Sequence, residues 1–170
     1  MLDPSRRDKR MRELQRRLGL TFFGHDAAEV LAEAMDSTPE VDEFVGRNHR
    51  NPRNYRLAQL GDAILDYVIV EILFEQGLSR GAIEYNKQKL VNNMTQHRLL
   101  MDWGLPRFYF NEKGFLGDPG IDQPASSPDH TPYLEAIIAV VYRCNGMEYT
   151  RDWIRRTVHP ALVKASRDLD

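Results

Sequence analysis

The chain has 170 residues, of which 42% are hydrophobic and 28% are charged, and 23 Lys and Arg against 25 Asp and Glu give a formal net charge of −2. This length suits one domain with a substantial core and is too short for two ordinary domains. The composition excludes disordered and collagen-like proteins, and no apolar run reaches the roughly 18 residues of a membrane span. The single cysteine, Cys144, excludes an internal disulfide, and no cysteine–histidine cluster suggests zinc.

Charge is unevenly distributed along the chain. Basic residues crowd positions 6–17, acidic residues are frequent over 26–43, and a second basic cluster lies over 151–167. No apolar stretch follows the first cluster, so a secretory signal peptide is not expected. The near-zero net charge argues against binding nucleic acid by overall charge, so such a role would need local patches. Taken alone, a basic cluster of this kind is more often a solvated helix face than a binding site for nucleic acid.

Helical periodicity dominates the first half of the chain. Residues 8–18 and 26–35 predict two short helices. Proline, glycine and asparagine over 39–52 then predict a loop. After this loop, apolar residues at helical spacing over 57–73 predict a long helix that ends near Gly77.

The second half continues the helical pattern. A further helix is predicted before Gly104, with Ser79 as its N-cap. Residues 106–132 are rich in Gly, Pro and Asp and predict a long loop. Residues 134–142 are strongly apolar and must be buried, and a helical segment over 150–166 closes the domain. Neither internal repeats nor convincing strands are found, so the sequence predicts a single all-α domain, a helical bundle.

The last segment, 150–166, contains Pro160, and an interruption of the helix is expected at that position.

Two carboxylates lie inside strongly apolar helical segments, Asp62 in the first and Glu135 in the second. Burying an ionised carboxylate costs several kcal/mol unless it is paired or bound to a cation. Small neighbours allow close helix approach, so the two acids could share a metal, and oxygen ligands suit Mg²⁺ or Mn²⁺. The alternative is that Asp62 pairs with an arginine or caps a backbone group. Glu135 would then simply favour the first turn of its helix, where the macrodipole stabilises negative charge.

Four segments carry a resemblance to a known family. Residues 54–65 (NYRLAQLGDAIL) resemble the signature helix of the ribonuclease III family. The other matches are the opening helix and turn at 14–22 (LQRRLGLTF), a central segment at 78–95 (LSRGAIEYNKQKLVNNMT) and the last signature at 134–142 (LEAIIAVVY). All four follow the family's order along the chain, which makes the resemblance specific.

The resemblance implies the all-helical ribonuclease III-type endonuclease domain. We expect it to fill residues 1–170, with its core at about 14–160, and without the double-stranded-RNA-binding domain that often follows it in this family. It also implies Mg²⁺-dependent (or Mn²⁺-dependent) hydrolysis of a phosphodiester in double-stranded or structured RNA. A homodimer in the cytoplasm or in an organelle, with no membrane attachment, is expected.

The family's usual site has four acids in each subunit, and this sequence keeps two of them. The signature aspartate falls on Asp62 and the last glutamate on Glu135, so these are the implied catalytic and metal-binding residues. The other two acidic positions fall on Ala58 and Pro132. The aromatic residue that usually contributes to the dimer is replaced by Gln59.

This departure leaves two interpretations open. The Mini-ribonuclease III branch also carries alanine where Ala58 stands, lacks an acid where Pro132 stands, and processes ribosomal RNA precursors. The other interpretation is a catalytically degenerate dimer that serves as an RNA-binding or assembly module. Whichever interpretation holds, proline cannot act as a ligand through its side chain, so Asp129 or His130 would have to reach in from the preceding loop to replace the acid missing at Pro132.

The resemblance and the two basic clusters also give candidate RNA contacts. Duplex RNA is contacted mainly through phosphates and 2′-hydroxyls, because the A-form major groove is too narrow for side chains. The candidate residues are Lys89, Asn93, Arg6, Arg7, Arg155 and Arg156.

Overall fold

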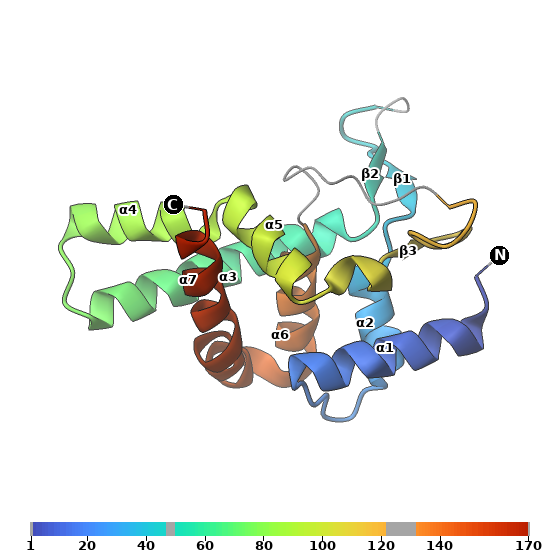
Figure 1. Cartoon of the computed structure of the whole chain (residues 1–170), viewed down its shortest axis with the longest axis horizontal. Helices are drawn as coiled ribbons and strands as arrows, with labels where there is room; N and C mark the ends of the chain where they lie inside the picture. Colours follow the sequence, from blue (N-terminus) through green and yellow to red (C-terminus); the bar gives the residue numbers. More distant parts are fainter. Residues whose placement is uncertain (1, 47–49, 122–131, 170) are drawn as a thin grey trace.

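Two helices from distant parts of the sequence, α3 (Tyr55–Glu75) and α6 (Pro132–Trp153), pack against each other at the centre of the molecule (Figure 1). The computed structural model describes residues 2–46, 50–121 and 132–169. Helix α2 (Ala27–Met35) lies against α6, and α1 (Pro4–Leu18) packs on α2. The fold is all-α, as the sequence predicts.

Helices α4 (Arg80–Val91), α5 (Asn93–Asp102) and α7 (His159–Arg167) complete the bundle. Helix α4 lies beside α3 and forms with it the arm at the left of Figure 1, while α5 and α7 pack against each other. None of the helices in the described ranges is long and apolar enough to cross a membrane.

The core follows from the apolar pattern of the two central helices. Residues 133–141 of α6 are buried apart from Glu135, which is partly buried, so the expectation for 134–142 is confirmed except at Glu135 and at Tyr142, which is 37% exposed. The facing stripe of α3 includes Ile64, Leu65, Val68 and Ile69, each no more than 6% exposed. Burial of such side chains stabilises the fold by about 1.5–3 kcal/mol each, relative to leaving them exposed.

Local capping sets several helix boundaries. Helix α1 begins at Pro4, earlier than predicted, because Asp3 accepts a hydrogen bond from the backbone N–H of Ser5 and proline suits the first turn. The predicted N-cap at Ser79 is confirmed, since its hydroxyl accepts from the N–H of Ala82 at 3.4 Å.

The helix predicted between Ser79 and Gly104 is wrong as a single element, because the chain breaks at Asn92. This residue has an extended backbone (φ −68°, ψ 158°). Its side chain accepts from the N–H of Thr95 at 2.9 Å and donates to the carbonyls of Gln88 and Lys89. Asparagine thereby ends α4 and caps α5, in place of the backbone hydrogen bonds that a continuous helix would make.

Short extended segments also occur where the sequence predicted only loops. Strands β1 (Pro39–Val41) and β2 (Arg50–Pro52) form one antiparallel pair, and β3 (Phe110–Asn111) and β4 (Gly114–Phe115) form another. A 3₁₀ turn at Leu105–Phe108 precedes β3. The loop expectation for 106–132 therefore holds only in part, and these strands are too short to change the all-α class.

The C-terminal helical region breaks at Gly146 and not at Pro160. Gly146 has φ 78° and ψ 177°, which is not helical, inside α6. A π-helical turn at Ile154–Val158 then leads into α7, where Pro160 occupies the first turn. The first-turn N–H groups of a helix have no intrahelical partner, so proline costs little at this position.

Candidate functional site

The two central helices touch at Gly61. A Cβ atom placed on Gly61 would lie 1.7 Å from the backbone carbonyl oxygen of Glu135 and 2.9 Å from its Cα. Only glycine therefore fits this crossing. The contact brings Asp62, the next residue on α3, beside the first turn of α6, which carries Glu135.

Asp62 and Glu135 line one open pocket of about 360 Å³. The predicted RNA contact Asn93 lines the same pocket, so the structure brings together three of the residues singled out in the sequence. Its other lining residues are Tyr55, Ala58, Gln59 and Pro132. Ala58 and Pro132 occupy the two positions at which the resemblance implies acids. Both line the same pocket as the two retained carboxylates.

A larger hollow of about 840 Å³ lies between α2 and the start of α3, away from these carboxylates. Two of its arginines are paired with acids that also line it, Arg53 with Asp36 at 3.1 Å and Arg143 with Glu33 at 2.9 Å. The chemistry of the smaller pocket, and not the size of this hollow, identifies the candidate site.

The pKa values of both carboxylates of the pocket are raised above their ordinary values. Burial raises the pKa of Glu135 to about 7, with further contributions from the charges of Asp62 and Asp66, against a hydrogen bond from Gln96 that lowers it. Burial, and then the charge of Asp66, also raises the pKa of Asp62, while Lys87 opposes this shift. A cation bound beside the two acids would therefore favour their charged forms and lower their pKa values.

Three residues near the carboxylates are absent from the sequence-based predictions. Asp66 lies one turn after Asp62 and pairs with Lys87 of α4 at 2.7 Å. Gln96 of α5 donates to Glu135 Oε1 at 2.9 Å. The four-residue spacing of the two aspartates was a visible signal, whereas Gln96 offered only a polar side chain within an amphipathic helix.

The carboxylate pair is a modest donor set for a metal ion. In the described ranges, no group of three or more His, Cys, Asp or Glu is placed to hold one. Asp129 and His130, the possible replacements for the missing acids, lie outside the described residues.

The predicted arginine contacts do not join this pocket. Arg6 of α1 makes two hydrogen bonds to Asp118, at 2.6 and 2.8 Å, and Arg7 pairs with Asp8 at 2.9 Å. Lys89 lies in the last turn of α4 and is not among the residues that line the pocket.

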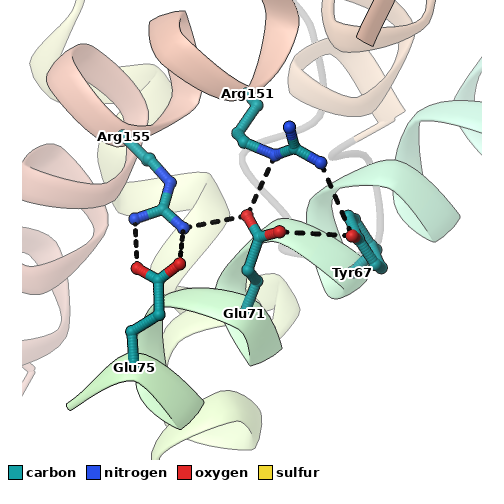
Figure 2. Close-up of polar contacts among 5 residues, drawn as sticks. All are labelled: Tyr67, Glu71, Glu75, Arg151 and Arg155. Carbon is teal, nitrogen blue, oxygen red and sulfur yellow. Dashed lines mark hydrogen bonds and ion pairs between the residues drawn. The ribbon is translucent and has the colours of Figure 1, made fainter. Parts of the chain in front are cut away.

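The second arginine cluster binds the far half of α3. Figure 2 shows Arg155 between Glu71 and Glu75, with nitrogen–oxygen distances of 2.8 Å to each. Arg156 donates instead to the carbonyl of Asp152 at 3.3 Å. Glu71 lies about 14 Å beyond Asp62 along the helix axis, at 1.5 Å for each residue. This network joins α3 to the end of α6 and is separate from the carboxylate pocket.

Comparison with known proteins covers most of the chain. The model of the ribonuclease III domain family matches residues 55–146. Ribonuclease 3 of Pseudomonas fluorescens is 32% identical over 162 residues, which are 91% of this chain and 64% of that protein. Ribonuclease 3 of Dechloromonas aromatica is 31% identical over 118 residues, which are 68% of this chain and 52% of that protein. The chain thus spans about half to two thirds of these relatives.

Solved structures agree on the fold. Two structures of the nuclease domain of ribonuclease III from Campylobacter jejuni match this chain with TM-scores of 0.65 and 0.64, at 23% and 24% identity. The matches cover 91% and 92% of this chain and 97% and 95% of those chains. Since the family match contains both Asp62 and Glu135 and the folds agree, the chain belongs to the ribonuclease III domain family.

Proposed function

We propose that this chain is a divalent-metal-dependent endoribonuclease that cleaves double-stranded or structured RNA. The observation that carries the proposal is the meeting of Asp62 and Glu135 in one open pocket. Family membership supports the same reaction class. Processing of ribosomal RNA precursors in the cytoplasm is the more specific role that we propose.

The chemistry of the two carboxylates fits a hard divalent cation. Asp62 and Glu135 would hold Mg²⁺ or Mn²⁺ through oxygen ligands, and their pKa values are raised chiefly by burial, with a further contribution from neighbouring negative charges. A cation bound there supplies Lewis-acid stabilisation of phosphate charge and lowers the pKa of water.

Among the remaining residues of the pocket, Asn93 is the candidate for contacting the substrate. Asn93 supplies an exposed amide that can donate to a phosphate oxygen or a 2′-hydroxyl. Ala58 and Pro132 supply no ligand, so the cation would keep more of its water than in a four-acid site. Mg²⁺ tolerates this hydration, but fewer protein ligands weaken its binding.

The same two residues favour a second candidate function. Because Ala58 and Pro132, which cannot act as ligands, line the same pocket as the retained pair, the chain could be a catalytically degenerate module that binds RNA or assembles with other components. That alternative predicts duplex binding without cleavage.

Cleavage of a long RNA duplex, with and without Mg²⁺ or Mn²⁺, separates the two candidates. The enzyme is expected to cut only with the metal, and Asp62→Asn and Glu135→Gln should each reduce the rate at least about 100-fold, since one ligand is lost from an already depleted set. Glu148→Gln, which changes an exposed glutamate of α6 beyond the break at Gly146, is the control. Binding of the duplex without any nicking under these conditions would establish the second candidate.

We also propose that the chain acts as a homodimer through an exposed stripe of α3. One of the Campylobacter structures concerns a region of that nuclease domain involved in dimer formation. In this chain, the stripe consists of four exposed apolar residues, Leu60, Tyr67, Val70 and Phe74. Consecutive members are separated by seven, three and four positions, and their exposed fractions are 39%, 49%, 36% and 71%. Such spacing places them on one helix face. A second copy would bury this face.

A further inference from the structure

Gln96 is an unusual residue for the interior of this bundle. It lies on α5 and is 1% exposed, although buried glutamine is uncommon in protein cores. Its amide nitrogen donates to the backbone carbonyl of Val91 and to Glu135 Oε1, at 2.9 Å in both cases. Its own oxygen, Oε1, is buried without a hydrogen-bond partner in the described part of the chain.

This arrangement is unfavourable for folding by itself. A buried carbonyl oxygen without a partner costs free energy, and leucine of similar size would avoid that cost. The two hydrogen bonds that the amide donates therefore hold it in a position that destabilises the fold. One of these bonds goes to Glu135, a carboxylate of the candidate site.

The amide is anchored through the break between α4 and α5. Val91 is the last residue of α4, so its carbonyl has no partner within that helix. Asn92 ends α4 and caps α5, which carries Gln96 one turn later. The two hydrogen bonds, one to α4 and one to α6, fix the orientation of the amide plane.

We propose that Gln96 is a positioning residue for Glu135, holding Oε1 so that Oε2 is the carboxylate oxygen presented to a divalent cation. The proposal rests on the proposed metal-dependent function of the same pocket. Oε2 makes no hydrogen bond within the described residues, and Glu135 lines the pocket from the first turn of α6. With only two carboxylates available, a fixed orientation of one of them matters more than it would in a four-acid site.

The test is a calorimetric titration of the intact chain with Mn²⁺ at neutral pH. Gln96→Leu should weaken Mn²⁺ binding about 10-fold or more, the usual effect of removing a residue that orients a metal ligand. The matched control is Gln88→Leu, because Gln88 donates to Glu84 at 2.8 Å on the exposed side of α4. The control should bind Mn²⁺ like the unmodified chain. Unchanged binding by a folded Gln96→Leu variant would overturn the proposal.

Two further measurements keep the proposal testable. Thermal unfolding and circular dichroism establish that Gln96→Leu is folded. If the unmodified chain binds no Mn²⁺, the metal-dependent function fails, and nitrogen-15 NMR then tests the contact alone. In that experiment the side-chain amide protons of Gln96 should exchange with water at least about 10-fold faster in Glu135→Ala, since one of the two hydrogen bonds that protect them is lost. An unchanged exchange rate would show that Gln96 does not hold Glu135.

Discussion

Gly61 controls the geometry of the candidate site because it allows the backbones of α3 and α6 to touch. The virtual Cβ distance of 1.7 Å from the Glu135 carbonyl oxygen leaves no room for even the smallest side chain. An added methyl group must therefore push the helices apart, and overpacking of a well-packed interior typically costs about 1–3 kcal/mol, sometimes more.

We predict that Gly61→Ala destabilises the protein by about 3 kcal/mol, measured as the free energy of unfolding in urea. Gly81→Ala is the matched control, because Gly81 lies in α4 with nothing within 4 Å of an added Cβ. Alanine is favoured over glycine in a helix, so the control should gain up to about 1 kcal/mol. Equal stabilities of the two variants would contradict the close helix contact.

Glu135 links the site to the pH dependence of folding. Its pKa is raised from 4.5 to about 7 in the folded chain, chiefly by burial. Between these values the folded state holds a proton that the unfolded state has released. The free energy of unfolding therefore falls as the pH rises through this window.

We predict that Glu135→Gln removes this loss, because glutamine cannot ionise. Below pH 4.5 the variant and the unmodified chain should have similar stability, and above about pH 7 the variant should be more stable. The expected gain is on the order of 2 kcal/mol, reduced from the full linkage value because the side chain keeps some contact with water. Urea unfolding at a series of pH values measures it, with Glu148→Gln as the control for losing one carboxylate. A variant that is less stable at every pH would argue against burial of a charged carboxylate.

At the scale of elements, α3 is held at both ends by different forces. Close packing at Gly61 fixes its start against α6, and the charged network of Figure 2 fixes its second half against the end of α6 and the π-helical turn. Arg155 is the centre of that network and contacts both Glu71 and Glu75. The side chains of Arg155 and Glu71 are 29% and 23% exposed, so water screens the network in part.

We predict that Arg155→Ala costs about 1 kcal/mol of unfolding free energy, the upper range for partly exposed ion pairs, and that the loss shrinks in high salt. Arg156→Ala changes the neighbouring arginine, which makes no ion pair within the described residues, and should cost less than about 0.5 kcal/mol. Thermal unfolding at low and high ionic strength compares the two variants. A salt-independent loss in Arg155→Ala would assign its role to packing of the side-chain stem.

Helix boundaries show where local reasoning succeeds and where it fails. The cap at Ser79 was predictable because capping depends on neighbouring residues in the sequence. The break at Asn92 was not predicted, since apolar residues continue at helical spacing on both sides of it. Its asparagine was a signal for a cap, but asparagine also occurs on exposed helix faces, and only the fold distinguishes the two.

At the scale of the whole molecule, the apolar stripe of α3 predicts association of two copies. Val70 lies near the middle of the stripe and is 36% exposed, and a charge there would have to be buried in the dimer. We predict that Val70→Glu shifts the protein from dimer to monomer in sedimentation velocity. Met101→Glu is the control, because Met101 of α5 is 50% exposed and lies off the stripe. Monomers in the unmodified protein at every concentration would contradict the proposed homodimer.

The sequence by itself determined the helical class, the buried character of most of 134–141 and the two carboxylates that need an explanation. These properties depend on periodicity, caps and residue type, which are local. Only the tertiary structure decided that Asp62 and Glu135 share a pocket with Asn93, that Gln96 contacts Glu135, and that Arg155 is bound to Glu71 and Glu75. Each of these contacts joins side chains far apart in the sequence, and their meeting depends on where the helices cross, which the close approach at Gly61 sets.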